Sequence, residues 1–301
     1  LASISETTII KQYSKPLRKW WEFCRQKHAN YFTPPIPSFL EFLSSSFTDI
    51  GSYATLNLYR SAISLISTNE VGTYPLVKRF LKSVAVLKPQ RPRYDYVWDP
   101  LPVIEHLATL YPHEGLSLES ISRKLVTLFA LMTAQRMQTL ASIRLSNVIM
   151  SDSVVIKVPA RLKTSGIGRS QPLLSFEPFL KRPELCIVSL IKFYLRISRD
   201  LRPETCDFFF ISVRAPYNAV SSQTLARWVK LELGAAGVDI GTFSAHSTRH
   251  ASTSLAAIKG ISLEEIRRTA GWTRSSETFA KFYNRPIIRD LSFQSAILNR
   301  S

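Results

Sequence analysis

The sequence predicts a mainly α-helical protein with a small antiparallel β-sheet, divided into a helical N-terminal domain and a mixed α+β second domain. Three observations support this fold class. Apolar residues recur at helical spacing along most of the chain. A Pro-rich segment of mixed charge near residue 90 has no periodicity and is typical of a linker. Only the region 154–176 has the short β-rich runs of a hairpin.

We expect a helical domain over residues 1–88, a linker over 89–100 and a second domain over 101–301. The first domain contains four stretches with a helical apolar period and no strand-like alternation. Its helices are predicted over residues 6–28, 33–47, 52–69 and 74–88. The segment "KPQRPRYDYVWDP" follows, and its prolines and missing periodicity indicate a linker.

The second domain combines helices with the hairpin. The strongly apolar stretch "SLESISRKLVTLFALMTA" predicts a helix over 117–134. The runs "VVIKV" and "QPLLSF", joined by a Gly-containing loop, predict the two strands. Further helices are predicted over residues 185–198, 221–237, 246–260 and 262–272. Apolar residues near the end of the chain predict an amphipathic C-terminal helix that includes Ile287, Leu291, Phe293, Ile297 and Leu298.

The charge of the chain points to a polyanionic partner. The net charge is +17 and the pI is near 10.0. Residues 1–100 carry 13 Lys and Arg against 7 Asp and Glu, and the rest of the excess lies in the second domain. Both domains are therefore expected to contact double-stranded DNA, although a basic protein without such a partner stays an alternative. The predicted contacts to the DNA backbone are Lys11, Arg18, Lys19, Arg60, Lys88, Arg91 and Arg93.

Several other classes of protein are disfavoured. No run of about 18 uncharged apolar residues predicts a membrane span. The opening "LASISETTII" has no basic or apolar region of a secretory signal, so we expect a protein that is not secreted. The three cysteines, Cys24, Cys186 and Cys206, are scattered and odd in number. This spacing disfavours a disulfide framework and a structural zinc site.

Six polar or aromatic side chains of the second domain are candidate catalytic residues. Arg136 lies in "TAQRMQTL", Lys163 lies in the hairpin loop, and the stretch "SAHSTRHAST" contributes His246 and Arg249. The last two are Trp272 in "AGWTRSS" and Tyr283 in "FAKFYNRP". Each residue type alone is more often found in a packing or surface role, so their order along the chain carries the hypothesis.

In this order, an Arg, a hairpin Lys, H-x-x-R, Gly-Trp and a late Tyr, the residues resemble the tyrosine recombinase (phage integrase) family. The resemblance covers nearly the whole chain, and H-x-x-R-H within "SAHSTRHAST" is its most specific motif. The ending F-x-x-F-Y-N-R-P looks most like DIRS-type retrotransposon and Crypton-like recombinases. The resemblance implies a helical core-binding domain and a mixed α+β catalytic domain. It also implies an integrase or transposase that cleaves and rejoins DNA through a 3′-phosphotyrosyl intermediate.

The resemblance also assigns roles. Tyr283 is the nucleophile, and Lys163 protonates the departing 5′ oxygen. Arg136 and Arg249 grip the non-bridging oxygens, for which a guanidinium fork is suited. His246 assists proton transfer from Tyr283 or holds the phosphate, and Trp272 can only donate through its indole N–H. Four basic side chains supply the positive charge and the phosphotyrosyl bond conserves energy, so no metal, ATP or other cofactor is expected.

The chain departs from the family pattern in places. Thr139 stands where the family often has an acidic residue, and Trp272 stands where it often has a histidine. Tyr283 follows Trp272 by 11 residues, about two more than is usual in the family. Lys157, in the predicted strand, is the alternative to Lys163. Thr139 and the second histidine of the motif, His250, are expected to support the site without touching the phosphate.

A zinc site is the alternative for "SAHSTRHAST". His246 and His250 are four residues apart and would share one helix face, as in HExxH. Ser247 replaces the glutamate of that motif, and Arg249 would oppose a divalent cation. We therefore expect no metal at this position.

Three functions remain open. The first is a site-specific recombinase that acts through dimers and tetramers and a Holliday junction, with the C-terminal helix docked on a neighbouring subunit; packing of that helix on its own domain is the alternative. The second is an inactive or domesticated DNA-binding protein derived from such a recombinase. The third is a type IB topoisomerase-like enzyme. A eukaryotic mobile element would place the protein in the nucleus, and another source would place it in the cytoplasm or nucleoid.

Overall fold

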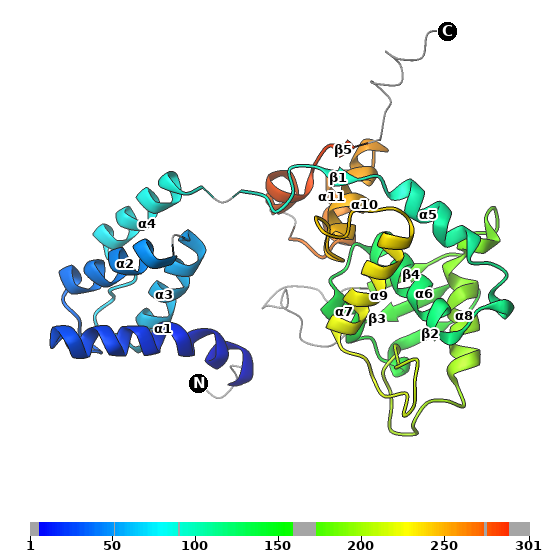
Figure 1. Ribbon diagram of the computed structural model, residues 1–301, viewed down its shortest axis with the longest axis horizontal. Helices are drawn as coiled ribbons and strands as arrows, with labels where there is room; N and C mark the ends of the chain where they lie inside the picture. Colours follow the sequence, from blue (N-terminus) through cyan, green and yellow to red (C-terminus); the bar gives the residue numbers. More distant parts are fainter. Residues whose placement is uncertain (1–5, 51, 90, 159–172, 274–275, 289–301) are drawn as a thin grey trace, which may run out of the picture. The chain divides into compact units, whose positions relative to one another are not determined.

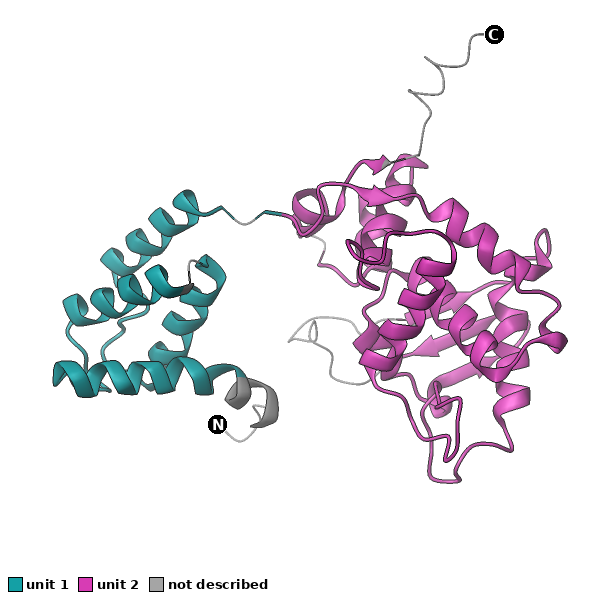
Figure 2. Cartoon of the chain, in the orientation of Figure 1, with its two compact units in different colours: residues 1–91 teal, residues 92–301 magenta. Residues whose placement is uncertain are grey.

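A computed structural model describes residues 6–50, 52–89, 91–158, 173–273 and 276–288. The chain divides into two compact units, residues 1–91 and residues 92–301 (Figure 2). The first unit is helical, and the second combines helices with a small antiparallel sheet (Figure 1). The predicted fold class, mainly α with a small antiparallel β-sheet, is therefore confirmed.

The described residues of the first unit form four helices around one apolar core. They are α1 (Glu6–Lys27), α2 (Ile36–Ile50), α3 (Tyr53–Ile66) and α4 (Pro75–Leu87). Trp20 of α1 is almost fully buried, and its ring meets Phe39 and Phe42 of α2 edge-on. The aromatic residues on the inner faces of the helices therefore hold α1 and α2 together.

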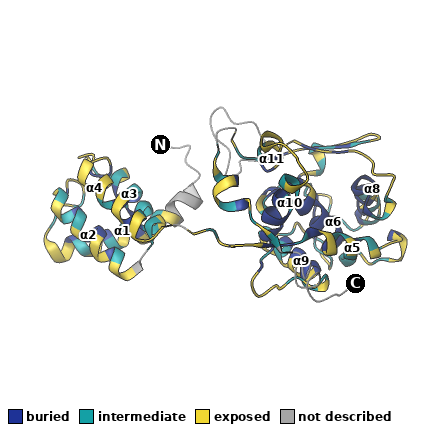
Figure 3. Ribbon diagram, turned by 90° about the horizontal axis from the view of Figure 1, so that it is seen from above, coloured by how far each residue is buried: buried dark blue, intermediate teal, exposed yellow. Residues whose placement is uncertain are grey.

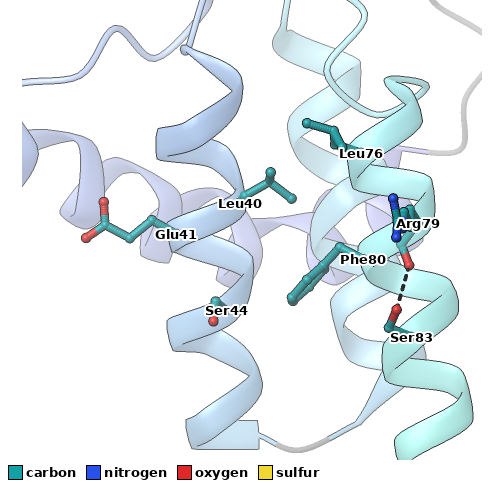
Figure 4. A pocket seen from close by; sticks show the side chains of 7 residues that line it. All are labelled: Leu40, Glu41, Ser44, Leu76, Arg79, Phe80 and Ser83. Carbon is teal, nitrogen blue, oxygen red and sulfur yellow. Dashed lines mark hydrogen bonds between the residues drawn. The ribbon is translucent and has the colours of Figure 1, made fainter.

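An open groove of about 530 Å³ lies between α2 and α4 of this unit. The side chains of Leu40 and Phe80 point into the space between the two helices, whereas Glu41 points away from it (Figure 4). On α4, the Ser83 hydroxyl donates to the backbone oxygen of Arg79 at 3.1 Å. The groove thus has an apolar floor and polar groups along its rim.

The second unit begins inside the predicted linker. Tyr94, Val97 and Trp98 are buried in the main core of this unit, where Val97 and Trp98 form the short strand β1 (Val97–Trp98). The helix α5 (Pro100–Thr109) follows, and the Asp99 side chain caps it by accepting from the Leu101 N–H. The prediction of a linker as far as residue 100 is therefore wrong for residues 94–100, because Tyr94, Val97 and Trp98 are packed in the core and the helix α5 begins at Pro100.

The apolar helix α6 (Leu118–Thr133) crosses the core of the second unit. It ends at Ala134, which has the left-handed backbone conformation (φ 49°) that terminates many helices. The short helix α7 (Met137–Ala141) leads into the sheet. This sheet has three antiparallel strands in the order β2 (Val148–Met150), β3 (Val154–Lys157) and β4 (Leu173–Phe176), so the structure adds β2 to the predicted hairpin.

Of the remaining helices, the first three pack on α6, and the fourth packs on the third. They are α8 (Ile187–Ser198), α9 (Ser222–Ala235), α10 (Ser247–Ile258) and α11 (Leu263–Thr269). The described connections also contain the short 3₁₀ helices η1 (His113–Gly115), η2 (Leu145–Asn147) and η3 (Pro183–Leu185). Figure 3 shows buried residues concentrated on α6 and α10. Among the described helices, none is both long and apolar enough to cross a bilayer.

A buried carboxylate joins three helices of the second unit. Glu232 of α9 accepts from Arg123 Nε of α6 at 2.6 Å and lies 2.9 Å from His106 Nε2 of α5. Because Glu232 is nearly inaccessible to solvent, these partners are needed to satisfy its charge. The cluster therefore fixes the relative positions of α5, α6 and α9.

The last described part of the chain is a strand. After the π-helical turn η4 (Phe279–Tyr283), the strand β5 (Ile287–Ile288) pairs in parallel with β1, with Val97 opposite Ile287. The prediction of a helix starting at Ile287 is therefore wrong for Ile287 and Ile288. The other residues of the predicted C-terminal helix, from 289 onward, lie outside the described residues.

Candidate active site

The motif H-x-x-R-H lies at the start of α10. His246 occupies the residue immediately before this helix, while Arg249 and His250 lie in its first turn. Arg249 is fully buried and His250 is almost fully buried. The helix therefore carries two basic groups inward, which requires polar partners or a bound anion.

Tyr283 lies against this motif although it is far away in the sequence. Its hydroxyl is 2.9 Å from His246 Nε2, which is a hydrogen bond between a phenol and an imidazole. The Tyr283 side chain is only 9% exposed, at the end of the turn η4. The imidazole is thus in position to take the phenol proton if its Nε2 is unprotonated.

Three side chains surround the ring of Tyr283. The His250 ring stacks on it with centroids 4.0 Å apart, and the Trp272 ring lies at 4.8 Å. The Arg249 guanidinium carbon is 5.6 Å from the centroid of the Tyr283 ring and 5.0 Å from that of Trp272. Burial, followed by the charges of His246, Arg249 and Arg285, lowers the pKa of His250 to about 3. His250 is therefore a neutral ring at physiological pH.

The backbone of Tyr283 is held separately from its side chain. The Ser254 hydroxyl on α10 donates to the Tyr283 carbonyl at 2.8 Å and accepts from the Arg285 N–H at 3.1 Å. Ser254 is fully buried, so neither group can exchange this partner for water. One serine therefore fixes the chain on both sides of Asn284.

Arg249 joins the ends of two helices. Its Nη1 donates to the carbonyl of Ala134 after α6, and its Nη2 donates to the carbonyl of Ala270 after α11 at 3.1 Å. Burial, followed by the charge of Arg136, lowers the pKa of Arg249 to about 10, whereas Tyr283 acts in the opposite direction. The guanidinium therefore stays charged at pH 7.

A second guanidinium lies close enough for its charge to act on the first. Arg136 is half-buried and immediately precedes α7. Within the described part of the chain, neither Arg136 nor Arg249 forms an ion pair with a carboxylate. Two neighbouring cations that have no acidic partner in the described ranges are suited to hold a phosphate or another anion.

Two N–H groups of this cluster are buried and have no hydrogen-bond partner among the residues that the structure describes. They are Nε of Arg249 and Nε1 of Trp272. Buried donors are nearly always satisfied in folded proteins, so an unsatisfied pair beside two arginines is consistent with a ligand that accepts hydrogen bonds. Across the described ranges, no three histidine, cysteine or carboxylate side chains group as metal ligands would.

The structure thus brings together five of the six residues that were predicted from their order along the chain: Arg136, His246, Arg249, Trp272 and Tyr283. Thr139 is buried on α7, and His250 contacts the ring of Tyr283 directly. Lys163 lies outside the described residues. Lys157, its alternative, ends β3 with an exposed side chain.

The predicted DNA contacts of the first unit differ in their surroundings. Arg18 is exposed, whereas Lys19 lies 3.7 Å from Asp49. Arg60 donates to the Asn57 side chain at 3.0 Å and to the Gly72 carbonyl at 2.8 Å, so it also braces a turn. The predicted contacts in and around the linker are exposed: Lys88, Arg91 and Arg93. Lys11 lies on α1. Contact with DNA stays a prediction for all seven.

Sequence reasoning missed three residues that hold the site. They are Ser254, Tyr94 and Trp98. Tyr94 and Trp98 contact the motif through Ser244 and Ser247, about 150 positions later in the chain. Their one signal in the sequence was the presence of large aromatic residues in a segment otherwise typical of a linker.

The comparisons agree with this architecture. A model of the phage integrase family matches residues 105–286. Among solved structures, the chain is similar to the XerH site-specific recombinase bound to difH substrate in a pre-cleavage complex, with 18% identity, a TM-score of 0.61, and coverage of 97% of this chain and 80% of that one.

Two further structures share the fold. A lambda integrase tetramer bound to a Holliday junction has 17% identity and a TM-score of 0.54, over 92% of this chain and 74% of that one. The Tn1549 transposon integrase in complex with circular intermediate DNA has 12% identity and a TM-score of 0.54, over 97% and 99%. No curated protein matches the chain significantly by sequence.

Proposed function

Because the chain belongs to the phage integrase family of tyrosine recombinases, we propose that it cleaves and rejoins DNA with Tyr283 as the nucleophile. The observation that carries the proposal is the 2.9 Å hydrogen bond between the Tyr283 hydroxyl and His246 Nε2, beside two arginines that have no acidic partner among the described residues. A phenol with a proton acceptor and an anion site next to it has what attack on a phosphodiester requires.

The proposed reaction conserves atoms and charge. The Tyr283 oxygen attacks the phosphorus, its proton passes to His246, and the bond from phosphorus to the 5′ oxygen breaks. Arg136 and Arg249 stabilise the charge on the non-bridging oxygens, with an N–H of Trp272 as a further donor. Lys163 protonates the 5′ oxygen. The reverse attack by a 5′-hydroxyl rejoins the strand, so the phosphotyrosyl bond supplies the energy and no ATP is consumed.

The test is covalent capture. A library of duplexes selected for binding to the wild-type protein supplies the target, which is then nicked so that the 5′-hydroxyl fragment is lost after cleavage. We expect an adduct that resists SDS and forms in EDTA with wild type, and none with Tyr283→Phe. An adduct in Tyr283→Phe would exclude Tyr283 as the nucleophile. Binding without any adduct would favour the alternative, a DNA-binding protein that has lost catalysis.

A role in a mobile element is the finer proposal. Its support is the structural similarity to the Tn1549 transposon integrase, together with the resemblance of the F-x-x-F-Y-N-R-P ending to DIRS-type and Crypton-like recombinases. An element of that eukaryotic type would place the protein in the nucleus. Duplexes from the ends of the element and its circular form would then be the substrates.

Self-association on DNA is proposed to use the C-terminal segment. An apolar cavity of about 320 Å³ lies between α5, α6 and α10, and the exposed Met132 lies on its wall. Residues 289–301 follow β5 and carry four large apolar side chains: Leu291, Phe293, Ile297 and Leu298. We propose that this segment of a second copy occupies the cavity. The tetrameric state of the similar lambda integrase complex supports the assembly.

A further inference from the structure

Tyr94 and Trp98, near the start of the second unit, form hydrogen bonds to the turn that contains His246. The Tyr94 hydroxyl lies 2.9 Å from Ser244 Oγ and accepts from the Ser244 N–H at 3.2 Å. The Trp98 indole donates to Ser247 Oγ at 2.8 Å. Two aromatic side chains therefore hold the residues that lie just before and just after Ala245 and His246.

The turn is also closed internally. The Ser247 hydroxyl donates to the Ser244 carbonyl at 2.7 Å, so both ends of the turn are joined to each other as well as to Tyr94 and Trp98. Tyr94 and Trp98 are both buried, at 5% and 6% exposure. Water is thus a poor substitute for either hydrogen bond.

Residues 94–98 also contact the chain next to Tyr283. The Val97 N–H donates to the Pro286 carbonyl at 2.9 Å, and β1 pairs with β5 just after Tyr283. The Tyr94 ring meets the His250 ring edge-on at 5.1 Å, and His250 in turn stacks on Tyr283. Residues 94–98 therefore contact both segments whose relative position sets the distance from His246 to Tyr283.

We propose that Tyr94 is a positioning residue for strand cleavage, acting with Trp98 to hold His246 and His250 in register with Tyr283. The inference rests on the proposed function. Packing alone would be served by phenylalanine, whereas the two hydrogen bonds to Ser244 require the hydroxyl. Tyr94 does not react; it limits the motion of the groups that do, and small displacements of reacting groups strongly reduce rates.

The test compares Tyr94→Phe with Tyr96→Phe. Tyr96 is two residues away, is 42% exposed and meets Phe243 edge-on without a hydroxyl partner among the described residues. Hydrogen exchange of the protein without DNA is the first measurement. In Tyr94→Phe we expect faster exchange in peptides covering residues 244–250 and 279–288, with peptides from α8 unchanged. Tyr96→Phe is expected to match wild type in all three regions.

Single-turnover adduct formation at saturating DNA is the second measurement. We expect the rate to fall about tenfold in Tyr94→Phe, the effect of about 1.4 kcal/mol in the barrier, with unchanged DNA affinity. A substrate whose leaving 5′ oxygen is replaced by sulfur needs little protonation, because a thiol has a far lower pKa than an alcohol. This substrate is expected to leave the tenfold deficit in place, since the defect lies in the attack.

The outcomes separate the two proposals. Unchanged exchange in Tyr94→Phe would show that the hydrogen bonds of Tyr94 to Ser244 do not hold the turn, and it would overturn the inference. Faster exchange with an unchanged cleavage rate would overturn the positioning role and leave the proposed function intact. A wild-type protein that forms no adduct would instead overturn the proposed function, and the positioning role in cleavage with it.

Discussion

The imidazole of His250 lies face to face with the phenol of Tyr283, with centroids 4.0 Å apart and ring planes at 18°. His246 bonds the hydroxyl of the same phenol, so the two histidines of the motif hold Tyr283 in different ways. Because His250 is neutral, its contribution is shape and contact, and the charge near the phenol comes from the arginines. The second histidine therefore contacts the ring of Tyr283 directly, and its supporting role in the site stays a prediction.

The first prediction concerns pH. The pKa of His250 is about 3 in the folded protein and about 6.5 when unfolded, so the unfolded chain binds the proton first. Burial of the neutral His250 ring therefore costs no proton-binding energy above pH 6.5. As the pH falls from 6.5 towards 3, this residue lowers the free energy of unfolding by up to about 1.4 kcal/mol per pH unit. Urea unfolding of wild type and His250→Phe at pH 7.5, 6.0 and 5.0 measures this.

We expect the free energy of unfolding to fall less steeply with acid in His250→Phe. A part of the slope should remain, because burial also lowers the pKa of His113. Identical slopes in the two proteins would show that His250 is not buried as a neutral ring.

The second prediction concerns Arg249. Arg249→Ala removes one of the two cations proposed to bind the phosphate and leaves the carbonyls of Ala134 and Ala270 without the donor that Arg249 provides. We expect adduct formation to fall at least about 10³-fold, with DNA affinity reduced less than about tenfold because most phosphate contacts lie elsewhere. The exposed Arg268 on α11 is the matched control, and Arg268→Ala should cleave nearly normally. Cleavage by Arg249→Ala at nearly the wild-type rate would exclude the proposal that Arg249 binds the phosphate.

The third prediction compares two serines of α10. Ser254→Ala removes the hydroxyl that bonds both the Tyr283 carbonyl and the Arg285 N–H. We expect a loss of about 1–3 kcal/mol in stability and a fall of about tenfold in cleavage rate. The buried hydroxyl of Ser252 has no hydrogen-bond partner in the described part of the chain, so Ser252→Ala should be neutral or stabilising. Thermal unfolding measures the stability of the two variants, and adduct kinetics measure their cleavage rates. Equal effects of the two substitutions would contradict the role of Ser254 in holding the backbone at Tyr283.

The fourth prediction identifies the general acid. A substrate with sulfur at the leaving 5′ position needs little proton donation. If Lys163 donates the proton, Lys163→Ala should cleave ordinary DNA poorly and the sulfur substrate at nearly the wild-type rate. Lys157→Ala should cleave both substrates normally. If the sulfur substrate restored cleavage by Lys157→Ala and not by Lys163→Ala, the general acid would be Lys157.

The fifth prediction concerns assembly. Truncation after residue 288 should leave DNA binding by single copies intact and reduce higher complexes on a target duplex. Met132→Glu, which places a charge at the wall of the apolar cavity, should do the same. Leu180 is more exposed and lies outside the cavity lining, so Leu180→Glu is the control. Analytical ultracentrifugation with DNA measures the stoichiometry, and unaltered tetramers in both variants would exclude this docking mode.

Local patterns were sufficient for most helices and for the hairpin, because apolar periodicity and turn residues act within a few positions. They failed for residues 94–100 and for Ile287. Tyr94, Val97 and Trp98 are buried by contacts with residues about 150 or more positions later. The pairing of β1 with β5 is equally non-local, so neither two-residue strand has a local signal of its own.

The sequence by itself determined the fold class, the basic character, and the identity and order of Arg136, His246, Arg249, Trp272 and Tyr283. These properties depend only on the types of the residues and on their spacing. Only the tertiary structure decided that Tyr283 bonds His246 and stacks on His250, and that Tyr94, Trp98 and Ser254 hold the two segments together. The physical reason is that such contacts join residues far apart in the chain, and packing of the whole unit selects them.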